Sequence, residues 1–264
     1  MKPNPFMSTM IRAKIVFPEQ VTRDVAYVQG VLCGDGHLST RLTLADCNYQ
    51  FVVNFRNAIR RITGYEYPIR TYIHHIDMKG RKHWEGIRYE VSIKKATILE
   101  YFARLGTYGT RTWKIPDHIL NGTDELKAAF IRGIFDSEAS VHIYHKGKQQ
   151  FASIDVGMVN PELHKLVDLL RCFDVRARTR TDIQKDGLVV YKLSITDLVS
   201  LINYMELIGW GITEKFLKLE PHLRLPKTGP QAFSPRCRDL RASGWVVNLV
   251  TEGKPMRWIA KGRL

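Results

Sequence analysis

The sequence predicts an α+β fold made of two similar halves related by a pseudo-two-fold axis, each with the element order αββαββα. Two observations predict this fold. Residues 26–36 and 129–139 share an apolar pattern that ends on an acid, and a similar series of strand and helix patterns follows each segment. One such half has too few strands to close on itself, so we expect two antiparallel four-stranded sheets, each covered by helices on one face.

In the first half, residues 36–45 alternate between polar and apolar and predict a tight hairpin. A helix is expected over residues 46–63, with Asp46 as its N-cap and Gly64 as the residue that stops it. The remaining patterns predict strands at 69–77 and 84–93, a turn between them at 79–82, and a helix at 95–105.

The second half repeats this order. Its expected elements are strands at 140–144 and 150–158 around a turn at 145–148, a helix from Asn160 to residue 173, strands at 176–182 and 188–195, and a helix at 196–207. We therefore predict four parts of the chain: an N-terminal arm (1–20), a first half (21–120), a second half (121–220) and a C-terminal extension (221–264).

The two repeated segments are predicted to be helices that pack against each other. Each carries two small residues four positions apart, which share one helical face and let two backbones approach closely: Gly30 and Gly34, and Gly133 and Ser137. Such packing would bring Asp35 and Glu138 together at the C-terminal ends of both helices. The alternative for either copy alone is a buried helix whose acid faces solvent, and two copies in register favour the paired arrangement.

Two carboxylates at helix C-termini repel each other and the unpaired carbonyls, which costs free energy unless a cation is present. Hard oxygen ligands suit Mg²⁺, which keeps several waters and bridges protein acids to phosphate oxygens. We therefore expect a metal site formed by Asp35 and Glu138 with the helix-terminal residues Gly34 and Ser137. Two metals there would stabilise the attacking and leaving oxygens of a phosphodiester displacement.

The residues 28–36 read VQGVLCGDG and residues 131–139 read IRGIFDSEA. This pair resembles the two LAGLIDADG motifs of the single-chain LAGLIDADG homing endonucleases, in which the eighth motif position is the catalytic acid. Asp35 and Glu138 stand at that position. The first copy departs from the pattern at Cys33, where Asp is common, and the second ends in Ala139 in place of Gly.

The resemblance implies a monomeric, Mg²⁺-dependent endonuclease that makes site-specific double-strand breaks in a long DNA target. It implies two or three metal ions, with Mn²⁺ able to substitute, and two sheets that form a DNA-binding saddle. It also implies a catalytic lysine near the end of a late strand. Lys94 stands there in the first half, whereas Thr196 occupies the matching position in the second, so only Lys192 could substitute.

The uncovered sheet faces are where we expect DNA to bind, because their side chains are of types that reach base edges and phosphates. The alternative is a solvated strand face, and alternation identifies the face only if the strand register is right. The candidates are Arg41, Thr43, Arg70, Tyr72, His74, Arg88, His142, Tyr144, Gln150, Ser153, Arg178, Arg180 and Lys192.

The composition supports a nucleic-acid partner independently of the motifs. Among 264 residues, 40 Lys and Arg stand against 26 Asp and Glu, a formal net charge of +14, which favours attraction to phosphate backbones. No apolar run is long enough to span a bilayer and the start lacks a signal-peptide pattern. We expect an intracellular protein, cytoplasmic in a prokaryote and organellar or nuclear in a eukaryote.

Residues 221–264 lie outside the repeat and carry nine Lys or Arg against two Asp or Glu. A short helix at 235–244 and a hairpin of 245–250 with 255–260 are expected, which favours a small DNA-contacting extension over a disordered tail. Two other function classes stay open: an intron RNA maturase, with intron RNA as its partner, and a DNA-binding regulator that does not cleave. Without a terminal His-Asn pair, an intron-encoded or free-standing origin is expected in preference to an intein.

Overall fold

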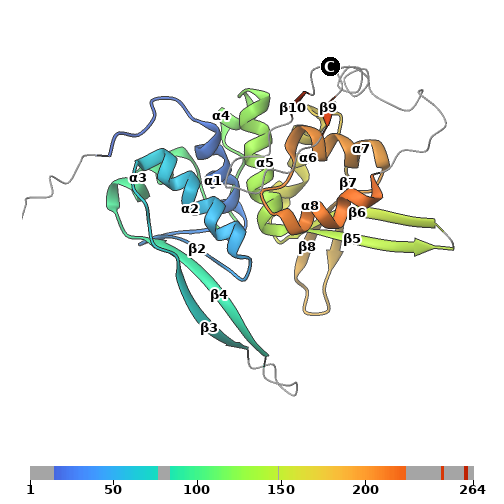
Figure 1. The fold of residues 1–264 in the computed structure, drawn as a ribbon, viewed down its shortest axis with the longest axis horizontal. Helices are drawn as coiled ribbons and strands as arrows, with labels where there is room; N and C mark the ends of the chain where they lie inside the picture. The colour runs from blue at the N-terminus through green and yellow to red at the C-terminus, as the bar shows by residue number, and fades with distance from the viewer. Residues whose placement is uncertain (1–14, 77–83, 148, 224–244, 247–258, 261–264) are drawn as a thin grey trace, which may run out of the picture.

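The computed structural model describes residues 15–76, 84–147, 149–223, 245–246 and 259–260. Two halves lie side by side, with one long helix of each half in the centre of the molecule (Figure 1). The first half contains α1 (Arg23–Cys33), β1 (His37–Leu38), β2 (Leu42–Asp46), α2 (Tyr49–Thr63), β3 (Arg70–Ile76), β4 (Trp84–Ile93), α3 (Ala96–Leu105) and α4 (Asp117–Leu120).

The second half begins with α5 (Asp124–Glu138) and repeats the same order. Its elements are β5 (Ala139–Lys146), β6 (Gln149–Met158), the 3-10 helix η1 (Pro161–Lys165), α6 (Leu166–Arg171), β7 (Arg178–Ile183), β8 (Val189–Ile195), α7 (Leu198–Asn203), the π-helix η2 (Tyr204–Ile208), α8 (Thr213–Leu219) and the 3-10 helix η3 (Glu220–His222). The predicted α+β fold with two antiparallel four-stranded sheets is confirmed: the strand orders are β1-β2-β4-β3 and β5-β6-β8-β7.

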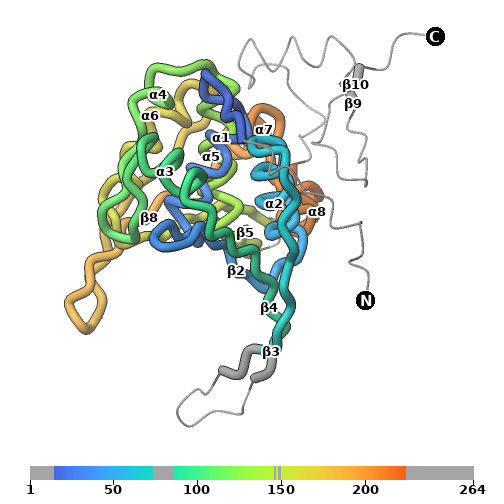
Figure 2. Tube along the Cα trace, turned by 90° about the vertical axis from the view of Figure 1, so that its left-hand side faces the viewer, coloured from blue at the N-terminus to red at the C-terminus, as the bar shows by residue number. Residues whose placement is uncertain are grey.

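Helices cover one face of each sheet, and the β3–β4 hairpin projects away from the helical layer (Figures 1 and 2). The alternation of side chains explains this. The side chains that face the helical layer are fully buried, namely Leu42, Leu44 and Val91. The alternate residues of β2, Thr43 and Ala45, are only partly buried. Among the described residues, the helices therefore cover only one face of each sheet and leave the other face open.

The centre of the fold is the contact between α1 and α5. A Cβ atom on Gly30 would lie 3.0 Å from the Cα of Gly133 and would clash with the carbonyl oxygen of Phe130. A Cβ on Gly133 would clash in the same way with the carbonyl oxygen of Tyr27. The predicted packing through small residues is confirmed, because only glycine permits this backbone approach.

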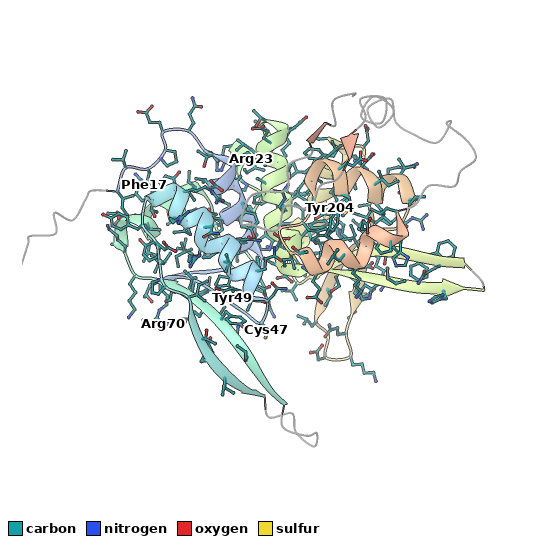
Figure 3. All side chains as sticks on the ribbon, in the orientation of Figure 1. Phe17, Arg23, Cys47, Tyr49, Arg70 and Tyr204 are labelled. Atoms are coloured by element: carbon teal, nitrogen blue, oxygen red, sulfur yellow. The ribbon has the colours of Figure 1, made fainter. Side chains whose placement is uncertain are left out.

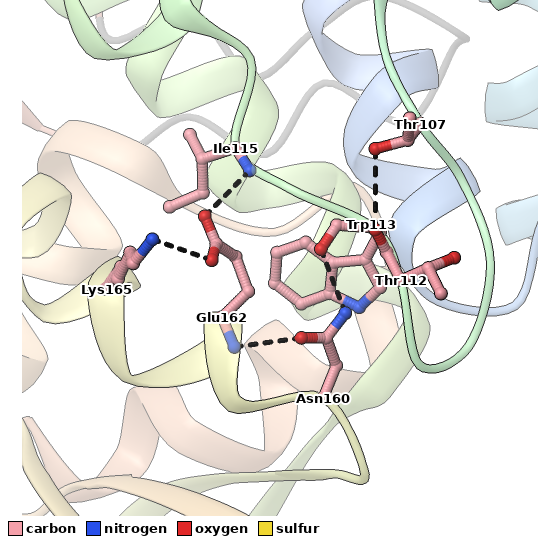
Figure 4. Close-up of polar contacts among 7 residues, drawn as sticks. All are labelled: Thr107, Thr112, Trp113, Ile115, Asn160, Glu162 and Lys165. Carbon is pink, nitrogen blue, oxygen red and sulfur yellow. Dashed lines mark hydrogen bonds and ion pairs between the residues drawn. The ribbon is translucent and has the colours of Figure 1, made fainter.

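A second contact joins the halves away from the helix pair (Figure 4). The Asn160 side chain donates to the carbonyl oxygen of Trp113 (2.9 Å), and the backbone N–H of Ile115 donates to Glu162 (3.2 Å). Lys165 pairs with the other oxygen of Glu162 (2.9 Å). The start of η1 thus holds the segment that leads from the first half into the second.

Helix ends correct the sequence prediction at one residue and confirm it at two. The N-cap of α2 is Asn48, whose side chain accepts from the N–H of Phe51 (3.0 Å), whereas Asp46 ends β2 and accepts from the N–H of Asn48 (2.6 Å). Gly64 ends α2 in the left-handed conformation, with φ of 73°, as predicted, and a helix begins at Asn160 as predicted, with Asn160 as the N-cap of η1.

Several elements differ in extent from the prediction or were missed. Strands β5 and β6 extend to residues 146 and 149, so the turn between them is shorter than predicted, with Gly147 at φ of 62°. The helices α4 and α8 were not predicted, because each is one or two turns long and leaves only a weak periodic pattern.

In the C-terminal extension, β9 (Trp245–Val246) and β10 (Ile259–Ala260) pair antiparallel, as the predicted hairpin requires. The predicted turn at 79–82 and helix at 235–244 lie outside the described residues. The division into parts at residues 20, 120 and 220 remains a prediction. Over the described ranges, no helix has both the length and the apolar character needed to cross a membrane.

Candidate functional site

The helix pair brings together the two acids that follow it. Gly34 caps the C-terminus of α1, and a Cβ on it would lie 2.9 Å from the hydroxyl oxygen of Ser137 and 3.1 Å from Cγ of Glu138. The charge of Asp35 is close enough to raise the pKa of Glu138. Asp35 and Glu138 therefore lie close together where the two halves meet, at the C-terminal ends of α1 and α5.

Burial sets the ionisation of both acids. It raises the pKa of Glu138 to about 7, repulsion from Asp35 adds to the rise, and Lys215 opposes it. Local desolvation also raises the pKa of Asp35 to about 6, although the residue as a whole is exposed. The carboxylate of Asp46 raises that pKa further, while Lys215 and Arg88 lower it. The surroundings of both acids thus disfavour the charged form of each carboxyl group, mainly through desolvation.

Lys215 is the cation that the sequence analysis missed. It comes from α8, and its Nζ donates hydrogen bonds to the carbonyl oxygens of Phe135 (2.9 Å) and Asp136 (2.6 Å) near the end of α5. Burial lowers its pKa, and the charges of Asp136, Asp35, Asp46 and Glu138 act against that fall. This one ammonium group is therefore close to both acids. The start of α8 after Gly211 was the only signal in the sequence that could have indicated it.

Asp136 explains how Lys215 is held there. Its buried carboxylate accepts hydrogen bonds from the Tyr27 hydroxyl on α1 (3.1 Å) and from the N–H of Gly211 (2.9 Å). The Asn54 side chain of α2 donates to the carbonyl oxygen of Gly211 (2.5 Å). The loop that enters α8 is thus fastened to both halves, and this fixes the lysine relative to the acids.

The two lysines predicted to be catalytic lie elsewhere. Lys94 follows β4 and is exposed, and Lys192 pairs with Asp182 on the open face of the second sheet (2.6 Å). Within the described ranges, neither is among the charges that act on Asp35 or Glu138. Lys94 and Lys192 therefore stay predictions as catalytic residues, and Lys215, which a later helix supplies, is a further candidate.

The strand register places most of the DNA-facing candidates of the first sheet on one face. Thr43 pairs with Ser92, Tyr72 with Arg88, and Arg70 with Glu90. Position 74 belongs to the same alternation, and Arg41 lies in the exposed turn between β1 and β2. Figure 3 shows Arg70 near the start of the β3–β4 hairpin.

The second sheet brings together five of its seven candidates. His142 and Tyr144 on β5, Arg178 and Arg180 on β7, and Lys192 on β8 share the open face by register. The other two need correction. Ser153 has this orientation but is buried and donates to Asp155, and Gln150 alternates with the covered residues Ala152 and Ile154. Gln150 therefore points to the helix-covered side.

Comparisons with known proteins identify a family model and several solved structures that this chain resembles. Residues 125–209 match the family model of the LAGLIDADG-like domain. The solved structure of the homing endonuclease I-WcaI bound to its DNA recognition sequence has a TM-score of 0.52 at 14% identity, covering 77% of this chain and 87% of that one. I-DmoI in complex with DNA and Mn has a TM-score of 0.43 at 17% identity, covering 71% and 96%.

A curated relative is the glutamine–fructose-6-phosphate aminotransferase (isomerizing) of Methanocaldococcus jannaschii, 26% identical over 223 residues. The match covers 81% of this chain and 18% of that protein, so the chain spans less than a fifth of the relative's length. The two antiparallel four-stranded sheets with their helices match the LAGLIDADG fold. The match of residues 125–209 to the LAGLIDADG-like domain confirms the resemblance seen in the sequence for that part of the chain.

Proposed function

We propose that this protein is a site-specific DNA endonuclease that makes metal-dependent double-strand breaks in a long target. The observation that carries the proposal is the approach of α1 and α5, which brings Asp35 and Glu138 into one electrostatically coupled site between two open sheet faces. Both acids belong to one chain, which supports action as a monomer. The solved I-WcaI structure is a complex with DNA, which supports double-stranded DNA as the partner.

The residues at this site fit a divalent metal. Asp35 and Glu138 supply hard carboxylate oxygens, and the backbone carbonyls of Gly34 and Ser137 lie at the same helix ends. In the described part of the chain, no three His, Cys, Asp or Glu residues gather as a ready-made metal site. Mg²⁺ suits a site with two carboxylates, since it completes its shell with waters and substrate phosphate oxygens. Bound Mg²⁺, or Mn²⁺ in its place, would stabilise the charged oxygens of phosphodiester cleavage.

The chain's own groups supply the rest of the activity. The ammonium group of Lys215 would stabilise negative charge that develops on the cleaved phosphate, because it is held beside both acids. Arg70, Arg88, Arg178 and Arg180 on the open faces would bind the DNA backbone and base edges on either side of the acids. Gly34, Ser137 and the remaining open-face candidates stay predictions of the same proposal.

The test uses the full chain and a DNA library, first with Mg²⁺ and then with Ca²⁺ to follow binding alone. Asp35→Asn or Glu138→Gln should abolish cleavage of at least one strand and leave binding in Ca²⁺ within roughly tenfold, since each change removes metal coordination and little else. Asp186→Asn, in the turn before β8, is the matched control and should cleave normally.

Full double-strand cutting by either acid variant would overturn the proposal. DNA binding without cleavage by the unaltered protein would favour the non-cleaving regulator. Tighter binding to intron RNA than to DNA would favour the maturase.

A further inference from the structure

The open faces of the two sheets begin with matching rows of side chains, two residues beyond each acid. In the first half the row runs His37, Thr43 and Ser92 across β1, β2 and β4. In the second half the row runs Ser140, Asp155 and Ser194 across β5, β6 and β8. Thr43 and Asp155 are thus equivalent positions, but only one of them is an acid.

Asp155 is held in an unusual way. The Ser153 hydroxyl donates to one carboxylate oxygen (2.5 Å) and the Ser194 hydroxyl donates to the other. No ion pair of Asp155 occurs among the residues that the structure describes. Asp182 on the same face differs, because it pairs with Arg180 (3.0 Å) and Lys192 (2.6 Å). The Asp155 carboxylate is therefore fixed in orientation by two neutral donors.

The two hydroxyl donors leave the Asp155 carboxylate able to accept further hydrogen bonds. An ionised Asp offers about four lone-pair sites, so about one on each oxygen remains for a partner. Ser153 is buried and Asp155 is partly exposed, which leaves the partner side on the open face. The site accepts hydrogen bonds and cannot donate any.

A carboxylate on a DNA-facing surface is repelled by phosphates, and a base amino group can offset that cost. Among base edges in the major groove, cytosine presents its N4 amino donor, guanine presents only acceptors, and adenine presents an acceptor beside its amino group. We propose that Asp155 is a specificity-determining residue that accepts a hydrogen bond from the amino group of a cytosine in the part of the target read by the second half. This inference rests on the proposed DNA-binding function.

The first half makes a different contact at the equivalent position. The Thr43 and Ser92 hydroxyl oxygens lie 3.4 Å apart, and each hydroxyl can donate as well as accept. The two target positions read by Asp155 and by Thr43 should therefore differ. Cytosine is required at the position that Asp155 contacts, whereas a donor or an acceptor base edge is tolerated at the position that Thr43 contacts.

The test is a binding selection from a randomised DNA library in Ca²⁺, made with the full-length protein and with Asp155→Asn, Ser194→Ala and Asp182→Asn. The unaltered protein should prefer cytosine over guanine by roughly tenfold or more at one base pair. Asp155→Asn should reduce that ratio to about twofold or less, and Ser194→Ala should reduce it partly at the same base pair. Asp182→Asn, the matched acid, should change affinity about equally for all sequences.

Melting temperatures of all variants exclude loss of the fold as a cause. An Asp155→Asn profile that keeps every base preference, or shifts all of them uniformly, overturns the inference while the proposed function stands. A change in Mn²⁺ affinity with unchanged base preference would make Asp155 a metal ligand instead. If the unaltered protein selects no sequence at all, the proposed function fails and the inference fails with it.

Discussion

The two motif helices differ two residues before the acid, where the first half carries Cys33 and the second carries Asp136. Both side chains are buried. Asp136 binds the Tyr27 hydroxyl of the opposite helix and the N–H of Gly211, and so fastens the loop that delivers Lys215. The position equivalent to Tyr27 in the second half is Phe130, which has no hydroxyl to pair with a carboxylate. The position two residues before the acid thus forms a buried hydrogen-bond network in the second half and packs among apolar side chains in the first half.

Gln29 and Arg132 are also equivalent residues, and they make the same kind of hydrogen bond although only Arg132 is charged. Gln29 donates to the carbonyl oxygen of Leu105 (3.3 Å), and Arg132 donates to the carbonyl oxygen of Ile208 (2.8 Å). Each side chain ties its motif helix to the end of a later helix. The two halves can therefore differ at this position, because a neutral donor and a charged donor both satisfy a buried carbonyl. The difference at Asp136 has a larger consequence, since it leaves one lysine, Lys215, close to both acids.

The largest expected effect comes from the feature that the halves share. Gly133→Leu should lower the free energy of unfolding by more than about 3 kcal/mol, because the new side chain would meet backbone atoms of α1 that cannot move aside. Thermal or chemical denaturation measures this. Gly157→Ala is the control, since a Cβ there finds its nearest neighbour at 3.8 Å. Equal stability of the two variants would show that α1 and α5 do not meet through Gly133.

Lys215→Met should sharpen the asymmetry at the acids. We expect cleavage of both strands to slow by about 10²- to 10³-fold, because one ammonium group serves both acids and its removal leaves developing charge unpaired. Single-turnover rates for each strand measure this, with Lys218→Met, at an exposed lysine of the same helix, as the matched control that should stay within about threefold. A loss confined to one strand would mean that the lysine serves one acid only.

Asp136→Cys would copy the first half into the second. It should cost about 2–3 kcal/mol of stability, since the N–H of Gly211 and the hydroxyl of Tyr27 would lose a buried acceptor. It should also slow cleavage through displacement of Lys215. In the double variant Asp136→Cys, Tyr27→Phe, part of the lost stability should return while cleavage stays slow. Recovery of both stability and cleavage would show that Asp136 does not hold Lys215 in place.

The smallest effect is a pH dependence. Because the pKa of Glu138 rises from its ordinary 4.5 to about 7 on folding, the ionised acid costs stability. The cost is absent below about pH 4.5, grows as pH rises, and is complete above about pH 7. Glu138→Gln should thus stabilise the metal-free protein by about 1 kcal/mol at pH 8, after allowance for screening, and by almost nothing at pH 4. Added Mg²⁺ should stabilise the unaltered protein more than the variant at pH 8.

These comparisons also show what the sequence could reveal. Gly30 and Gly133 predicted the helix pair because small residues four positions apart on a helical face can be read from a short stretch of sequence. Gly64 predicted a helix end because a glycine after a helical pattern can be read in the same way. Lys215 could not be found that way, since it reaches the acids only through contacts between residues far apart in the chain. Gln150 was assigned to the wrong face because it was placed with Ser153, which lies three residues further along the same strand, whereas side chains alternate between the two faces.

The glycine contact between α1 and α5 also sets a delay during synthesis. Residue 33, the end of α1, leaves the ribosome about a hundred residues before residue 138, the end of the helix that covers its glycine face. At about 5–20 residues per second this face waits for roughly 5–20 seconds without its partner. We expect ribosome-bound chains to gain protease resistance only once α5 has emerged. Resistance of nascent chains that end near residue 105 would show that the first half folds alone.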